Sequence, residues 1–248
     1  MNVSALQIHQ ALEAVASLRA QRAAHAGLAS ASLAIKRFQA QRFTATYADL
    51  LKAPRYQAAT QFFLTELYGD KDYGDRDQQF ARIASTIVRL FPQAVINTAG
   101  ALAEVHALTE HLDNQMALYW LAQETAAPNI SQITRYIACW QQVANPATRH
   151  EQLKVVLALG QSLNALTGKP GLRTLLKMMR APAAAAGLKS LQEFLETGFD
   201  AFAAMRGANE FLEVINQRET EWIAMLFSID TVACETKLSH LMGPQGGR

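Results

Sequence analysis

The stretch LKSLQEFLETGFDAFAAM, residues 188–205, indicates the fold of this chain. Its apolar residues recur every three or four positions, which is the spacing of one face of an α-helix. That stripe consists of Leu191, Leu195, Phe199 and Phe202. Gly198 falls inside the stripe, where the missing side chain lets another helix approach closely. The pattern predicts an amphipathic helix that packs tightly against a neighbour.

Similar stripes run along almost the whole chain, separated by Gly and Pro, which end helices or begin new ones. They predict helices over about 4–25, 29–53, 56–68, 75–90, 93–123, 131–144, 146–166, 170–180, 188–205 and 208–229, with a short amphipathic piece at 231–242. An alanine-rich joint covers 182–187. No alternating run of β-branched residues predicts a strand, and no fixed repeat predicts a solenoid. We expect an all-α protein, an irregular multi-helix bundle of about ten helices. It forms one domain over 1–242, with a disordered tail at 243–248.

Composition narrows the class of protein. The 248 residues include 44 alanines and carry 23 basic against 21 acidic side chains, a net charge of +2. This balance excludes a disordered chain and provides no field for nucleic acid or an anionic membrane. No stretch is long and apolar enough to span a membrane, and the N-terminus does not resemble a signal peptide. With only Cys139 and Cys234, both expected to be reduced and buried, we predict a cytoplasmic protein.

The segment FFLTELYGDKDYGDRDQQFARI, residues 62–83, is the most distinctive in the chain. It resembles the FF-x-x-x-LYG-x-x-D-[FY]-x-x-RD-x-x-F-A-R signature of a family of uncharacterised bacterial helical proteins. The later stretch around 194–212 is similar to that family too. The resemblance implies a bacterial, cytoplasmic, all-helical protein and carries no activity, so catalytic residues and cofactors stay unknown. We call the residues of this motif the motif corner: Phe62, Phe63, Tyr68, Gly69, Asp72, Asp75, Arg76 and Asp77.

The acidic residues of this corner suggest a cation site, because hard cations prefer several carboxylate ligands. An EF-hand that starts at Asp70 needs Gly and Glu where the chain has Asp75 and Ala81, so that motif fails. The simpler interpretation is a helix–loop–helix corner. There Asp75 caps the next helix, and Asp77 lies near the positive end of that helix.

A second candidate lies on the longest predicted helix, over 93–123. His106, Glu110 and Asp113 are spaced at i, i+4 and i+7, so their side chains share one helix face. Helical bundles build metal sites from such groups, and these three are the candidate metal ligands. The di-iron pattern Glu-x-x-His is absent. The alternative is a polar face beside the apolar stripe, or a hydrogen-bonded His–Glu pair.

Other patterns carry less weight. The sequence TGKPG at 167–171 lacks the Ser or Thr of a phosphate loop, and nothing around His9 or His25 specifies a haem ligand. Lys36, Arg37 and Arg42 are interpreted as a solvated face. Six aromatic residues fit either the lining of a cavity for an apolar ligand or plain core. They are Phe38, Phe43, Tyr47, Phe62, Phe63 and Tyr68.

Two functional hypotheses follow. The first is a non-catalytic interaction or regulatory protein that contacts a protein partner, or a second copy of itself, through its helix surfaces. It rests on the absence of catalytic motifs and on the many amphipathic helices. The second is a helical-bundle enzyme or carrier that binds a metal or an apolar cofactor.

Overall fold

The computed structural model describes residues 3–67, 73–90 and 93–243. Within these ranges all regular structure is helical and no strand is present, so the all-α prediction is confirmed. The helices are α1 (Val3–Ala23), α2 (Ala26–Thr46), α3 (Ala48–Lys52), α4 (Gln57–Phe62), the π-helix η1 (Phe63–Leu67), α5 (Gly74–Leu90), α6 (Gln93–Ala126), α7 (Gln132–Val143), α8 (Pro146–Thr167), α9 (Leu172–Met178), α10 (Arg180–Ala185), α11 (Lys189–Ala204), α12 (Asn209–Leu226) and α13 (Thr231–Met242).

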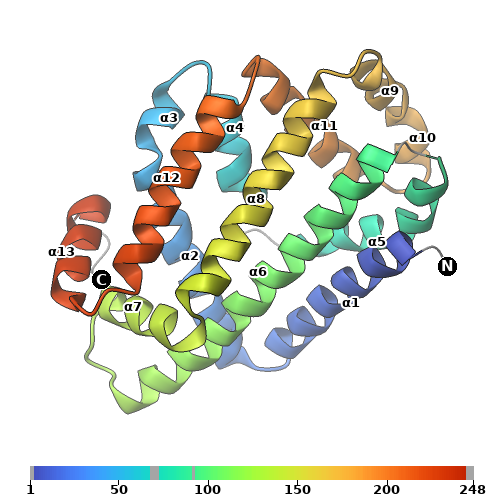
Figure 1. The fold of residues 1–248 in the computed structure, drawn as a ribbon. Helices are drawn as coiled ribbons and strands as arrows, with labels where there is room; N and C mark the ends of the chain where they lie inside the picture. The colour runs from blue at the N-terminus through green and yellow to red at the C-terminus, as the bar shows by residue number, and fades with distance from the viewer. Residues whose placement is uncertain (1–2, 68–72, 91–92, 244–248) are drawn as a thin grey trace.

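Four long helices, α1, α6, α8 and α12, follow one another across the molecule, each packed against the next (Figure 1). The 34-residue α6 is the longest and spans about 50 Å. Helices α2 and α5 pack against this row, and α11 contacts α4, α5 and α8. Because α6 touches α1, α2, α7 and α8, its side chains reach most of the interior.

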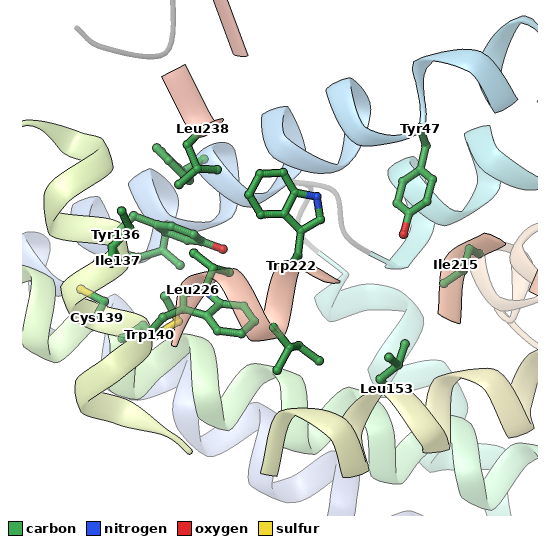
Figure 2. Packing of buried hydrophobic residues seen from close by; sticks show 14 of the residues in the cluster. Tyr47, Tyr136, Ile137, Cys139, Trp140, Leu153, Ile215, Trp222, Leu226 and Leu238 are labelled. Atoms are coloured by element: carbon green, nitrogen blue, oxygen red, sulfur yellow. The ribbon is translucent and has the colours of Figure 1, made fainter. Parts of the chain in front are cut away.

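The buried apolar residues form two main clusters at different levels of α6. One joins α2, α7, α12 and α13 around Met116 and Trp120 of α6, and Figure 2 shows part of this packing. The other joins α1, α5 and α11 around Ile96 and Ala103 of α6. His106, Glu110 and Asp113 lie along α6 between these two levels.

Helix boundaries agree with the Pro and Gly signals over most of the chain, and α13 matches its predicted range. Three predicted segments are divided further. The expected helix over 29–53 breaks at Tyr47, whose backbone leaves the helical region (φ −111°, ψ 21°). The segment 56–68 ends in the π-helix η1, and 170–187 forms two short helices, α9 and α10. The described residues therefore contain thirteen α-helices where about ten were predicted.

The close approach predicted at Gly198 is confirmed. A Cβ atom placed on Gly198 would lie 2.8 Å from Cζ of Phe62, closer than a real Cβ contact. The ring of Phe62 in turn packs against Phe194 of α11, with 5.4 Å between centroids. This is how α4 docks directly on the backbone of α11.

None of the helices in the described ranges combines the length and apolar character needed to span a membrane. Both cysteines are free and buried, as predicted. The assignment of 1–242 to one domain stays a prediction. So does the tail at 243–248, of which residues 244–248 lie outside the described ranges.

Candidate functional site

The three candidate metal ligands on α6 each face a different partner. His106 Nε2 lies 2.8 Å from Oδ2 of Asp77 on α5. Glu110 binds basic groups of α1 and α2, and Asp113 accepts a hydrogen bond from Gln39 of α2. Among the described residues no three His, Cys, Asp or Glu side chains come together as a metal would need. His106, Glu110 and Asp113 lie on one face of α6 as predicted, but their side chains do not converge on one common site.

Glu110 is the centre of a buried ion cluster. It is 3 % exposed, and its carboxylate accepts hydrogen bonds from Nη2 of Arg22 at 2.6 Å and Nζ of Lys36 at 2.5 Å. Burial alone would raise the pKa of the Glu110 carboxyl, but Lys36 and Arg22 lower it further than burial raises it. The cluster therefore joins three helices, α1, α2 and α6, through one carboxylate that is charged at neutral pH.

The pKa of Asp113 shifts in the opposite direction to that of Glu110. It is 4 % exposed and accepts a hydrogen bond of 3.1 Å from Nε2 of Gln39. Burial raises the pKa of the Asp113 carboxyl, and the positive charge of Lys36 opposes this only in part. One turn apart on α6, Glu110 and Asp113 thus differ in the protonation state that the fold favours.

As the pH rises, we expect the free energy of unfolding to fall less in Asp113→Asn than in wild type. A raised pKa means that the folded protein binds this proton more tightly than the unfolded chain. The stabilisation that the Asp113 carboxyl gives to the folded wild-type protein is therefore fully present below the unfolded pKa of 3.8. It falls as the pH rises through the folded pKa. Asparagine does not titrate in this window. Urea unfolding of both proteins from about pH 4 to about pH 8 measures the difference.

The matched control for this experiment is Asp49→Asn, because Asp49 has a shift of the opposite sign. Hydrogen bonds from Arg218 lower the pKa of Asp49 to about 2. Its contribution to stability is present above pH 3.8 and lost as pH falls towards 2. A difference between wild type and Asp113→Asn that stays constant with pH would contradict the prediction.

In the motif corner, Asp77 is buried and not merely placed near a helix end. Oδ2 of Asp77 accepts a hydrogen bond of 2.9 Å from Nη2 of Arg19 and lies 2.8 Å from His106. Burial would raise the pKa of this carboxyl, but His106, Arg19 and Arg76 together lower it. The corner is thereby tied to α1 through Arg19 and to α6 through the imidazole of His106.

The other described residues of the corner also have structural contacts. Arg76 donates a hydrogen bond of 3.0 Å to the carbonyl oxygen of Glu66 and lies 4.5 Å from the ring of Phe194. Asp75 is inside the first turn of α5 and not its cap, and it accepts hydrogen bonds from Gln79 and Ser190. The remaining residues of the motif lie outside the described ranges: Tyr68, Gly69 and Asp72.

An apolar cavity of about 270 Å³ lies next to this corner. Its lining comes from α4, α5, α6, α8, α9, α10 and α11, and Phe62 of the motif is part of it. The polar residues of the lining are three threonines and Gln192. For comparison, a 150 Å³ cavity lined by aliphatic and aromatic groups stays dry and binds benzene. This cavity has the size and chemistry for an apolar molecule.

Two short helices, α9 and α10, cover one side of the cavity. They have seven and six residues, and helices of this length are marginal without tertiary contacts. None of the residues of α9 is buried. The pair is bounded by Gly171 and Gly187, whose positive φ values of 81° and 66° favour glycine. Ion pairs from Arg173 to Asp200 and from Arg180 to Glu196 fasten the two helices to α11, and these pairs are exposed to solvent.

The predicted solvated basic face needs correction. Arg42 is 1 % exposed and binds Glu219 through both Nη atoms, and Lys36 is mostly buried and binds Glu110.

Of the two alternatives for the six aromatic residues, core packing is the one found for the five that are described. Phe38 and Tyr47 belong to the larger cluster, Phe43 and Phe63 pack against it, and Phe62 belongs to the other cluster and also lines the apolar cavity. Phe43, Tyr47 and Phe63 line a separate polar pocket. Tyr68 lies outside the described residues.

The cavity itself was missed from the sequence. Its sequence signal is the leucine-rich stretch of α9 beside the alanine-rich segment of α10, because alanines fill little of the space between helices. That signal does not distinguish a cavity from a well-packed interior.

Comparison with known proteins gives one match. The family model described as a domain of unknown function (DUF8198) matches residues 18–232. No curated protein and no solved structure matches the chain.

Proposed function

We propose that this chain, which belongs to that DUF8198 family, is a non-catalytic carrier that binds an apolar small molecule in the cavity beneath α9 and α10. The observation that carries the proposal is the 270 Å³ apolar cavity. An empty cavity costs about 24 cal/mol per Å³, so 270 Å³ corresponds to at most about 6.5 kcal/mol. Since whole domains are stable by only about 5–15 kcal/mol, an occupant would contribute substantially to folding.

The exposed apolar residues beside the cavity support the same role. Leu175 and Met179 line the cavity and are 42 % and 37 % exposed, and Met178, outside the lining, is 70 % exposed. They lie on or directly after α9, the helix that covers the cavity. An exposed apolar patch of this kind is typical of a contact surface. We propose that the protein partner expected from the sequence contacts α9, beside the cavity. Bacterial origin and cytoplasmic location are parts of the same proposal.

Filling the cavity tests the proposal. Ala183 on α10 is 4 % exposed and lines the cavity, so Ala183→Leu puts additional carbon atoms into it. We expect the ligand-free variant to unfold at a higher temperature than wild type, because the added atoms gain contacts. We also expect its affinity for the apolar fluorophore 1-N-phenylnaphthylamine to fall about fivefold or more. A general defect in folding would lower both the unfolding temperature and the affinity for the fluorophore.

Ala185→Leu is the matched control, because Ala185 lies on the same helix but is exposed and outside the cavity lining. It should bind the fluorophore as wild type does. The proposal would be overturned by wild type that shows no saturable binding, or by Ala183→Leu that binds with unchanged affinity. Mass spectrometry of the purified native protein gives a further check, since a carrier retains apolar molecules from the cell.

A further inference from the structure

A second hollow, distinct from the apolar cavity, lies deep between α2, α6, α7, α8 and α12. Its volume is about 80 Å³, and we call it the polar pocket. Its walls combine apolar side chains such as Leu153 and Ile215 with an unusual number of charged and hydrogen-bonding groups. The polar members that carry the argument are Arg42, Asp113, Tyr136, Trp140, Arg149 and Glu219.

Three buried donor atoms in this lining have no hydrogen-bond partner of good geometry. They are the hydroxyl of Tyr136, Nε1 of Trp140 and Nε of Arg42. The indole of Trp140 nevertheless lies close enough to the hydroxyl of Tyr136 to lower the pKa of Tyr136 against the larger effect of burial. These residues are 0 %, 6 % and 1 % exposed, so bulk water does not supply the missing partners. In Figure 2 the hydroxyl of Tyr136 points into the bundle, towards the side where Tyr47, Leu153 and Ile215 lie. Each unsatisfied buried polar group costs about 1–3 kcal/mol, so three around one pocket indicate a missing acceptor.

The surroundings hold these donors in fixed positions. The ring of Tyr136 stacks on Phe38 with 4.1 Å between centroids. The guanidinium of Arg149 lies 4.1 Å from the centroid of the Trp140 ring. Both Nη atoms of Arg42 bind Glu219, which leaves its Nε directed elsewhere. Donors fixed in this way need little further ordering when a ligand binds.

The charges of the lining suit a monoanion. Arg42 and Arg149 contribute two positive charges, and Glu219 and Asp113 contribute two acidic groups. Arg42 is held by Glu219, and burial raises the pKa of Asp113, which opposes ionisation of this carboxyl beside a bound anion. Burial also raises the pKa of Tyr136, so its hydroxyl keeps the proton that it donates.

We propose that the polar pocket binds the carboxylate of a small organic acid, with Tyr136, Trp140 and Arg42 donating hydrogen bonds to its oxygens and the apolar walls enclosing its short carbon chain. A volume of 80 Å³ is enough for about five to eight water molecules and is about half that of the cavity that binds benzene, so the site suits a short acyclic acid. The site is separate from the apolar cavity, and this inference goes beyond the carrier function.

The test uses sodium butanoate as the probe and butanamide as its neutral analogue, with sodium chloride added to equal ionic strength. Isothermal titration should give saturable binding of butanoate with a dissociation constant near about 1 mM, and at least tenfold weaker binding of butanamide. In the ¹H–¹⁵N spectrum, the indole signal that disappears in Trp140→Phe should shift on addition of butanoate.

Tyr136→Phe separates binding from folding. Because the hydroxyl donates to no protein acceptor and only the indole of Trp140 approaches it, its removal should change the stability of the ligand-free protein little. The affinity for butanoate should fall about tenfold, as expected for loss of a hydrogen bond to a charged group. Ala183→Leu should bind butanoate normally, and Tyr136→Phe should bind the apolar fluorophore normally, so the two proposals fail independently.

Two outcomes would overturn the inference. One is the absence of saturable binding of butanoate and of the smaller acetate up to about 20 mM, which would mean that the pocket contains water only. The other is equal affinity of wild type and Tyr136→Phe for butanoate.

Discussion

Replacing Glu110 with glutamine is expected to lower the free energy of unfolding by about 3–5 kcal/mol, the usual cost of breaking a buried ion pair from one side. The substitution leaves the guanidinium of Arg22 and the ammonium of Lys36 without their counter-charge. The side chain of Arg22 is 10 % exposed and that of Lys36 is 17 % exposed, so solvent compensates little. For a chain of this length the midpoint of thermal unfolding should fall by about 6–20 °C.

The pH dependence of this effect has a defined sign. Because Arg22 and Lys36 lower the pKa of Glu110, the stabilisation is present above the unfolded value of 4.5 and is lost as pH falls through the folded pKa. The difference in free energy of unfolding between wild type and Glu110→Gln should therefore become smaller at acidic pH. Glu104→Gln serves as the control, since Glu104 is exposed on the same helix. A Glu110 variant as stable as the Glu104 variant at pH 7 would contradict the role of the cluster.

Glu219→Gln is expected to have an effect of similar size, about 3–5 kcal/mol. Arg42 is 1 % exposed, and Glu219 accepts hydrogen bonds from both of its Nη atoms at 3.2 and 2.8 Å. Burial alone would lower the pKa of Arg42, but Glu219 raises it further, so the guanidinium stays charged and needs this carboxylate. Glu219 also accepts a hydrogen bond of 2.7 Å from the hydroxyl of Tyr47, which the substitution weakens.

Urea unfolding measures this loss, with Glu213→Gln as the control because Glu213 is exposed on the same helix α12. The double variant Arg42→Met/Glu219→Leu should recover much of the stability, since apolar replacement of a whole buried ion pair is often neutral or favourable. If the single and double variants are equally unstable, the loss comes from packing and not from an unpaired charge.

The helices were predictable from the sequence because their signals are local. The Pro and Gly positions mark most ends, and the stripe of α11 predicted the close approach at Gly198. No Pro or Gly marks the end of a helix at Tyr47. The helix breaks there while the Tyr47 ring is buried and its hydroxyl binds Glu219, a contact from a distant part of the chain. The π-helix η1 likewise has no local marker in FLTEL.

The candidate sites were less predictable for the same reason. The spacing of His106, Glu110 and Asp113 correctly placed them on one face of α6, but their partners come from α1, α2 and α5. A buried arginine such as Arg42 looks like a surface arginine in its own neighbourhood of sequence. Both cavities are formed by side chains from several helices. The sequence pattern of any one helix does not predict how these helices pack together.

The distance along the chain between Arg42 and Glu219 has a consequence for synthesis. The two residues are 177 positions apart. A ribosome that adds about 5–20 residues per second needs about 10–35 s to make the intervening chain. During that time α2 has no carboxylate from α12 for Arg42, and the largest apolar cluster lacks the residues of α12 and α13. The nascent N-terminal helices are thus the part of this protein most exposed to wrong association, and a chaperone would find its binding surface there.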